Sequence, residues 1–249
     1  MIIHGDCLGA LAALPDRFAR LAYIDPPFNT GSDREIHGRS YDDEFDDYEK
    51  FLMPRIESSL HCLTNDGSIF VHLDHREVHY VKVWMDRLLG RDKFMNEIIW
   101  SFDYGGRSKR KWPAKHNTIL WFTLDPKNYI FNYDAIDRIP YMAPNLVGKE
   151  KAARGKTPTD VWWSTIVHTT GHERVDYPTQ KPMKVLERIV NVHSNPNDTV
   201  LDFFAGSGTT GHAAAKNDRS FVLVDSNEQA IDVMKKRLER YEPNIVSAV

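Results

Sequence analysis

The chain has 249 residues, of which 41% are hydrophobic and 27% charged, which is the balance of one ordinary globular domain with room for a modest insertion. It has no apolar run of membrane-spanning length and no secretory signal, and its two cysteines, Cys7 and Cys62, form neither a disulfide framework nor a metal-type spacing, so we expect a cytoplasmic protein. The net charge of −3 argues weakly against a nucleic-acid partner but does not exclude one, because positive charge is concentrated in short stretches.

Short apolar runs of strand length alternate with amphipathic segments of helix length along most of the chain. In chain order we expect strand 21–24, helix 45–63, turn 65–67, strand 68–73, helix 76–89, strands 96–102 and 118–123, helix 182–193, strand 199–203, helix 207–216, strand 221–225 and helix 228–241. Strands that alternate with helices in this way predict an α/β fold with a doubly wound, mostly parallel sheet.

Two stretches depart from this alternation. Between about 132 and 178 the periodicity fades and Pro, Gly, Lys and Thr dominate, which indicates an insertion or small subdomain. Residues 31–41, which include Arg39, form a loop that we expect to close over a ligand as a lid, although an idle surface loop explains them equally well.

A glycine turn, F-F-A-G-S-G-T from Phe203 to Thr209, lies between a predicted strand and a predicted helix. Its glycines let the backbone approach a ligand closely, and the helix that follows presents free N–H groups to an anionic group such as a carboxylate. Asp225 ends the next strand, where a carboxylate accepts the hydroxyl protons of a ribose. Gly211 completes a G-x-G-x-x-G spacing, so the glycines alone do not exclude a dinucleotide cofactor or a plain turn.

The segment Asp25-Pro26-Pro27-Phe28 follows another predicted strand. The exocyclic amine of adenine or cytosine is a poor nucleophile, so its methylation needs two acceptors against its N–H bonds, which the Asp25 carboxylate and the Pro26 carbonyl supply. A fixed carboxylate also stabilises the positive charge that grows on the nitrogen, and Phe28 stacks on a flipped base. Alone, the segment is better explained as a proline-terminated strand end. Its occurrence together with the glycine turn reverses that preference. A nicotinamide dehydrogenase is disfavoured, because its chemistry does not require D-P-P-F at a strand end.

Together these motifs resemble those of the DNA N6-adenine/N4-cytosine amino-methyltransferases, in which D-P-P-[YFW] is the catalytic motif and F-x-G-x-G binds S-adenosylmethionine. The resemblance covers nearly the whole chain, and D-P-P-F before the glycine motif is the permuted β-group order; Phe28 stands where tyrosine is commoner. It implies the Rossmann-like fold of S-adenosylmethionine-dependent methyltransferases in a single domain. Residues 1–131 would form its catalytic half, about 132–178 a target-recognition insertion, and about 179–249 its cofactor-binding half.

The resemblance also assigns cofactor-binding residues. The segment from His4 to Leu8 resembles one whose aspartate contacts the cofactor adenine, and the segment from Tyr177 to Pro182 resembles one that holds the methionine moiety, with Lys181 as the partner of its carboxylate. The expected cofactor-binding residues are Asp6, Cys7, Asp25, Lys181, Pro182, Phe203, Ala205, Gly206, Ser207, Gly208, Thr209, Asp225 and Ser226. We expect no metal ion.

The aspartate of D-P-P favours N6 of adenine in double-stranded DNA within this family, whereas S-P-P leans toward N4-cytosine. N4-cytosine DNA, N6-adenine RNA, and binding of nucleic acid without catalysis remain alternatives. The residues expected to contact DNA are Arg39, Arg107, Lys109, Arg110, Lys111 and Lys115. Because about 45 residues is small for target recognition, a homodimer would add contacts. A cognate restriction endonuclease is a further candidate partner, and we expect the protein at the nucleoid.

Overall fold

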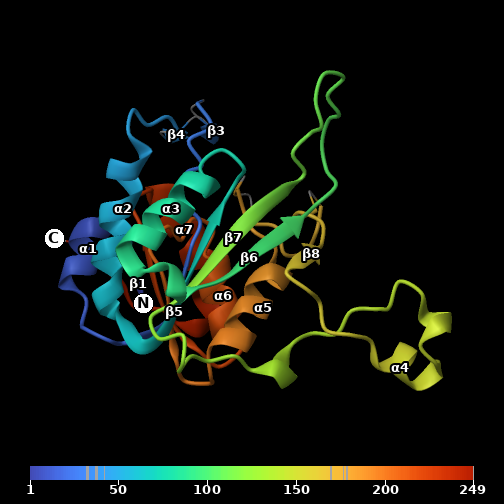
Figure 1. Ribbon diagram of the computed structural model, residues 1–249. Coiled ribbons are helices and arrows are strands. Elements are labelled where there is room, and N and C mark those ends of the chain that lie inside the picture. Colours follow the sequence, from blue (N-terminus) through green and yellow to red (C-terminus); the bar gives the residue numbers. More distant parts are fainter. Residues whose placement is uncertain are drawn as a thin grey trace.

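A sheet of nine strands forms the centre of the protein (Figure 1). The computed structural model describes residues 1–31, 34–36, 39–41, 43–168, 170–175, 177 and 179–248. In order across the sheet its strands are β11 (Ile245–Ser247), β1 (Ile2–His4), β10 (Ser220–Asp225), β9 (Thr199–Asp202), β2 (Ala19–Ile24), β5 (Leu63–Leu73), β7 (His116–Thr123), β6 (Phe94–Ser101) and β8 (Val161–Trp163). Strand β7 is antiparallel to β5 and β6, and the other neighbours in this sheet are parallel. The doubly wound, mostly parallel sheet expected from the sequence is therefore confirmed; β3 (Arg34–Ile36) and β4 (Arg39–Tyr41) form a separate hairpin.

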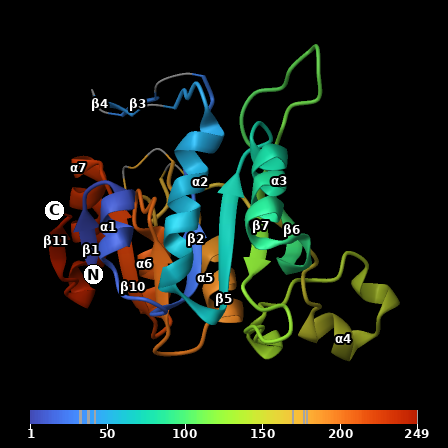
Figure 2. The same ribbon diagram turned by 60° about the vertical axis from the view of Figure 1, so that its left-hand side comes forward.

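Helices cover both faces of the sheet (Figure 1 and Figure 2). On one face lie α1 (Cys7–Ala13), α2 (Tyr48–Ser59) and α3 (Val78–Leu89), and on the other α5 (Met183–His193), α6 (Thr209–Lys216) and α7 (Glu228–Leu238). In α5, Val185, Leu186, Ile189 and Val190 recur at helical spacing and are buried, at about 1.5–3 kcal/mol for each fully buried aliphatic side chain. None of the helices described has the length and apolarity needed to cross a membrane.

The order in which successive strands are added to the sheet changes direction between the parallel strands β9 and β2. The connection from β9 through α6 leads to β10 on one side, and the connection from β2 through α2 leads to β5 on the other. In sheets of this type, ligands bind beyond the carboxyl ends of the strands at such a point. Strand β1 lies between β10 and β11, so the beginning of the chain is built into the sheet among strands from its end.

The second helix differs from its predicted bounds. It was expected over 45–63 but begins at Tyr48, because the Asp47 carboxylate accepts the Lys50 N–H (3.1 Å) and caps the helix there. It ends at Ser59, where a 3₁₀ turn (Leu60–Cys62) follows. Phe45 thus extends the apolar pattern without extending the helix.

The turn predicted at 65–67 is wrong. Ala19 pairs with Leu63 and Leu21 pairs with Ser68, so residues 64–67 bulge from the ladder while β5 continues through them. The turn-forming residues there produce an irregular strand and no chain reversal.

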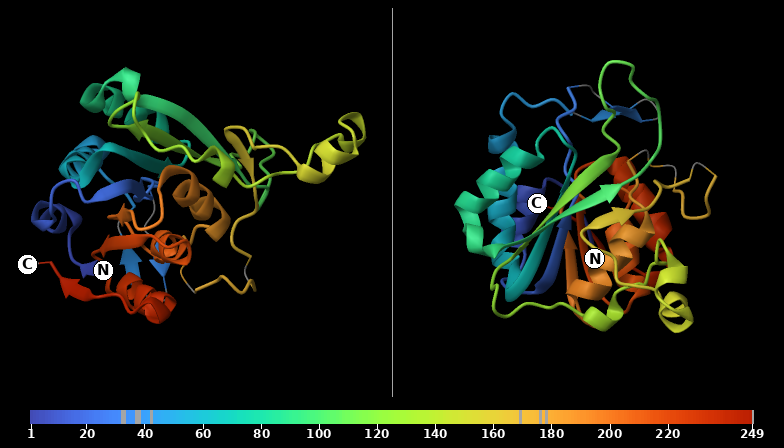
Figure 3. Two further views of the ribbon diagram at one scale, coloured as in Figure 1. Left: turned by 90° about the horizontal axis from the view of Figure 1, so that it is seen from below. Right: turned by 45° about the vertical axis from the view of Figure 1, so that its right-hand side comes forward.

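Two segments extend from opposite edges of the sheet, where an edge is the side formed by one end of the strands (Figure 1 and Figure 3). Residues 102–115, here called the finger, join β6 to β7 at the carboxyl edge of the parallel strands. Residues 133–160, here called the lobe, leave the sheet from the opposite edge and contain α4 (Lys149–Arg154); backbone hydrogen bonds between Ile139 and Lys156 (2.8 and 2.9 Å) close its neck. Because β8 then returns the chain to the carboxyl edge, the insertion expected at 132–178 is divided between the two edges.

Candidate active site

A cavity of about 680 Å³ lies at the carboxyl ends of β2 and β9, where the strand order reverses. All the residues expected in the catalytic and cofactor sites line it except Pro182 and Gly208. Pro182 is the N-cap of α5, and Gly208 lies behind the glycine turn as the N-cap of α6. The structure therefore brings the two predicted motifs into one cavity.

The glycine turn after β9 has backbone angles that favour glycine. Gly206 and Gly208 have φ of +48° and +70°, in the left-handed region. A Cβ on Gly206 would lie 3.2 Å from the Tyr177 ring, and a Cβ on Gly208 would lie 2.7 Å from Met234 Cγ. Gly206 thus keeps this wall of the cavity open, while Gly208 lets α7 pack against the start of α6.

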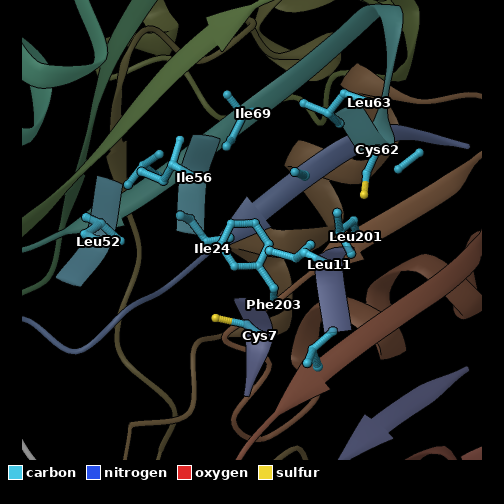
Figure 4. Close-up of a cluster of buried hydrophobic side chains, with 14 of the residues drawn as sticks. Cys7, Leu11, Ile24, Leu52, Ile56, Cys62, Leu63, Ile69, Leu201 and Phe203 are labelled. Carbon is cyan, nitrogen blue, oxygen red and sulfur yellow. The ribbon is translucent and has the colours of Figure 1, made fainter. Parts of the chain in front are cut away.

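The ring of Phe203 points into the hydrophobic core beneath the turn. It lies near Ile24, Leu11 and Cys7 (Figure 4), and it is 1% exposed. Its side chain therefore anchors the glycine turn to the core.

The start of α6 is hydrogen-bonded to two other segments. Arg237 of α7 donates to the Thr209 hydroxyl (2.8 Å) and to the carbonyl of Ser207 (3.1 Å). Thr209 in turn donates to the carbonyl of Lys181 (3.3 Å), which joins α6 to the segment before α5. A Cβ on Gly211 would lie 2.6 Å from a side chain of β10, so the third glycine of the motif serves helix–strand packing. Arg237 was not foreseen from the sequence, because it lies in α7, outside the motif.

Three neighbouring strands carry an aspartate at this edge. Asp25 follows β2, and Asp202 and Asp225 end β9 and β10. The carboxylate of Asp225 accepts the N–H groups of Gly206 (2.7 Å) and Asn227 (2.8 Å), so it ties the glycine turn to β10. Burial raises its pKa. Its binding of a ribose stays a prediction.

Asp202 is a buried acid that the sequence did not single out. It accepts the Phe204 N–H at 3.0 Å. Burial raises its pKa to about 7, and the charges of Asp25 and Asp225 add to this effect, while a hydrogen bond from Thr210 opposes it. Its position at a strand end was visible in the sequence, but its two acidic neighbours depend on the strand order.

The segment after β1 contributes Asp6 and Cys7. Asp6 caps α1 by accepting the Leu8 N–H (3.0 Å) and pairs with Arg55 of α2 (3.2 Å). Burial raises the pKa of Cys7 to about 11, so it is a thiol at neutral pH and no nucleophile. Arg55 is a cavity residue that the sequence gave no reason to select.

Asp25 has one paired and one unpaired oxygen. Lys181 forms an ion pair with its Oδ2, whereas its Oδ1 is buried and has no hydrogen-bond partner among the residues described. Burial raises the pKa of Asp25, and the Lys181 charge opposes that rise. The Lys181 ammonium also lies 5.1 Å from the centroid of the Phe28 ring. The role of the Pro26 carbonyl as a second acceptor stays a prediction.

The backbone after Asp25 is fixed by neighbouring helices. The carbonyl of Pro27 accepts a hydrogen bond from Tyr48 Oη (2.5 Å). Asn29, with φ of +56°, donates its N–H to Asp43 (2.8 Å) and its side-chain amide to Glu77 (2.8 Å). The D-P-P-F segment is thus held in one geometry from α2 and from the start of α3.

A buried histidine lies behind Phe28. The rings of Phe28 and His72 are stacked at 6.1 Å and 27°, and Trp100 meets His72 edge-on at 5.6 Å. Burial and the charge of Lys181 keep the pKa of His72 well below its usual range, so the ring is neutral. It accepts from Asn117 at Nε2 (3.0 Å), which leaves Nδ1–H to donate to Tyr23 Oη (2.6 Å). The apolar pattern of 68–73 predicts burial of this strand, but it does not show which of its residues faces the cavity.

The residues expected to contact DNA, apart from Arg39, lie on the finger, outside the cavity. Lys109, Arg110 and Lys111 are exposed, as is Trp112, at 96%. Arg107 pairs with Asp103 (2.5 Å), and the half-buried Lys115 donates to the carbonyl of Tyr104. At the base of the finger, Phe102 and Tyr104 line the cavity, so the basic loop adjoins the site. The side chain of Arg39 lies outside the described part of the structure.

The chain is similar to known proteins over most of its length. A family model for DNA methylases of the N6/N4 type matches residues 19–236. The chain is 32% identical over 239 residues to the type II methyltransferase M.HpaI of Haemophilus parainfluenzae, which covers 96% of this chain and 74% of that protein. It is 31% identical over 251 residues to the DNA adenine methyltransferase YhdJ of Escherichia coli K12, covering 96% and 82%.

Solved structures share the fold. M1.HpyAVI in complex with S-adenosylmethionine superposes with a TM-score of 0.66 at 22% identity, covering 96% of this chain and 98% of that one. The PvuII DNA methyltransferase, which is specific for cytosine N4, superposes with a TM-score of 0.67 at 16% identity, covering 99% and 94%. The likeness in fold therefore extends over nearly the whole chain.

Proposed function

The chain belongs to the N6/N4 DNA methylase family, and we propose that it methylates N6 of an adenine flipped out of double-stranded DNA, with S-adenosylmethionine as the donor. The unpaired Oδ1 of Asp25 carries this proposal, because it is a buried acceptor in a residue that lines the cavity next to Phe28. The likeness to YhdJ, a DNA adenine methyltransferase, favours adenine over cytosine.

The residues of the cavity fit S-adenosylmethionine, which supplies an electrophilic methyl group when bound. Gly206 leaves open space beside Tyr177, and the start of α6 offers N–H groups to an anionic group. Asp225 and Asp6 lie at the ends of the neighbouring strands β10 and β1, where carboxylates suit the hydroxyl and amino groups of a nucleoside.

The catalytic residues act on the amine of the target base. In our proposal Asp25 Oδ1 accepts one N–H and the Pro26 carbonyl accepts the other, which draws the nitrogen toward a tetrahedral shape. The carboxylate then stabilises the positive charge that develops on that nitrogen. Phe28, held in place by His72, stacks on the base and returns about 1–3 kcal/mol of the cost of flipping.

We assign the partners of the enzyme from the same reasoning. The finger, with its exposed cations beside the cavity, would follow the DNA backbone. A homodimer would extend this contact surface, and a location at the nucleoid and an association with a cognate restriction endonuclease would suit a DNA methyltransferase.

Incubation with radiolabelled cofactor and double-stranded DNA, followed by digestion to nucleosides, tests the function. We expect the label in N6-methyladenine, and Asp25→Ala should lower kcat by about 10²–10⁴-fold. Asp92→Ala, at an exposed position outside the cavity, is the control and should keep full activity. Label in N4-methylcytosine, label in RNA alone, or an Asp25→Ala variant as active as the parent would contradict the proposal. A parent that binds DNA without methylating it would be a binding module.

A further inference from the structure

Lys181 connects the two parts of the site. Its carbonyl accepts the Thr209 hydroxyl at the start of α6, while its ammonium contacts Asp25 and faces the ring of Phe28. The ammonium also donates to the carbonyl of Thr179 (3.3 Å), and the side chain is only 11% exposed. The ammonium of Lys181 thus lies beside the catalytic segment, while the backbone carbonyl of the same residue contacts the start of α6 after the glycine turn.

We propose that Lys181 is the counter-ion of Asp25, a positioning residue that keeps the carboxylate charged through Oδ2 and leaves Oδ1 for the amine of the base. In this role it is not the partner of the cofactor's carboxylate, which the family resemblance suggested. The inference rests on the proposed function, because it assumes that the amine of a base is the ligand of Oδ1.

The contacts of the ammonium support this assignment. An ammonium has three N–H donors, and here it meets a carboxylate oxygen, a backbone carbonyl and the face of an aromatic ring. A cofactor carboxylate could gain this lysine only by displacing one of those partners. Losing Asp25 would be the most costly exchange, because a buried carboxylate without a partner takes up a proton.

Among the residues described, Lys181 is the cation that lowers the pKa of Asp25. Tyr23 of β2 and Tyr48 of α2 are neutral, because burial raises the pKa of both phenols. His72 of β5 is neutral as well, and Asp202 of β9 is itself an acid. Removal of the Lys181 charge therefore raises the pKa of Asp25, and activity should be lost at a higher pH on acidification.

The dependence of kcat on pH tests the role toward Asp25. Lys181→Met should move the acid limb upward by about 1–3 pH units. Lys181→Arg, which keeps the charge, should leave the limb close to that of the parent. Lys184→Met, the same change at an exposed position three residues later, is the matched control. An acid limb that does not move in Lys181→Met, or moves equally in Lys181→Arg, would overturn the inference.

Ligand binding gives a second readout that does not need turnover. Calorimetry would compare S-adenosylhomocysteine with 5′-methylthioadenosine, which lacks the amino-acid part and its carboxylate. We expect Lys181→Met to leave the ratio of the two affinities unchanged. A tenfold or greater loss for S-adenosylhomocysteine alone would assign Lys181 to the cofactor and refute the counter-ion role. Failure of the proposed function is distinguishable, because it would appear as a parent that does not methylate DNA.

Discussion

The three aspartates at the carboxyl edge are held in three different ways. Asp25 has the ion pair with Lys181, and Asp225 has two backbone N–H donors. Asp202 lies on the strand between theirs and has hydrogen bonds from Phe204 and Thr210. Burial raises the pKa of all three carboxyl groups, so each of them takes up a proton at a higher pH in the folded protein than it would in the absence of burial.

Asp202 should make the stability of the protein depend on pH. Its pKa rises from 3.8 to about 7 on folding, so the folded state binds this proton more tightly than the unfolded state. The free energy of unfolding is therefore expected to decrease as the pH rises through this interval. Asp202→Asn keeps an oxygen for the Phe204 N–H and removes the titration, so its stability should decrease less between about pH 5 and pH 8.

Urea unfolding at several pH values measures this difference. Asp92→Asn, which changes an exposed carboxyl group, controls for the loss of charge. If the stability of Asp202→Asn follows the same pH profile as that of the parent, Asp202 does not titrate as described.

At the residue scale, the sequence predicted side chains that belong to a local motif and missed those defined by neighbouring strands. Asp25, Gly206 and Asp225 follow from motif and spacing. The role of His72 and the pairing of Lys181 with Asp25 depend on contacts between segments more than 40 and 150 residues apart, respectively. No local pattern encodes such contacts.

The finger and the lobe lie at opposite edges of the sheet, and this changes the proposed location of DNA recognition. The insertion predicted at 132–178 divides into the lobe, remote from the cavity, and a returning segment whose Ile166, Val167 and Arg174 line the cavity. We therefore expect base contacts from the finger and the returning segment.

The salt dependence of DNA binding tests this expectation. Changing Lys109, Arg110 and Lys111 of the finger together to Gln should reduce the slope of log K against log salt by about 0.9 for each phosphate that these cations neutralise in the parent. The same triple change at Lys149, Lys151 and Arg154 of the lobe is the matched control and should leave the slope unchanged. Fluorescence anisotropy with a labelled duplex gives both slopes. A larger reduction of the slope in the lobe variant would place the DNA on the other edge.

At the element scale, long periodic segments were predicted better than short strands. The helices α3, α5 and α7 lie within one or two residues of their expected starts, and Gly90 ends α3 as expected. Five three-residue strands were missed, because each is too short to show an alternating pattern. Strands β1, β8 and β11 gain their stability from partners elsewhere in the chain, whereas β3 and β4 pair with each other where a loop was expected.

At the scale of the whole molecule, the pairing of β2 with β9 joins the two predicted halves in one sheet. Cys7 and Cys62 both belong to the first predicted half but lie on opposite sides of this junction in the sheet, since Cys7 follows β1, beyond β10, and Cys62 precedes β5, beside β2. Both are buried, and burial raises the pKa of each thiol to about 11. Neither thiol should react with a disulfide reagent in the folded protein.

Single-cysteine variants, Cys7→Ser and Cys62→Ser, should expose the remaining thiol at the same urea concentration, because the sheet is continuous. The rate of labelling across a urea series measures both transitions. Labelling of Cys7 at a clearly lower urea concentration than Cys62 would show that the two sides of the sheet open separately.

The position of β1 between β10 and β11 also has a consequence for biosynthesis. The first residue and its partner on β10 are 220 positions apart, so the ribosome makes β1 long before either neighbour exists. Strand β2 is likewise made before its partner β9. The unpaired edges of β1 and β2 stay open to pairing with other chains while translation continues. A nascent chain therefore carries D-P-P-F without the proposed cofactor site, and we expect the enzyme to gain its activity only after the last strands have emerged.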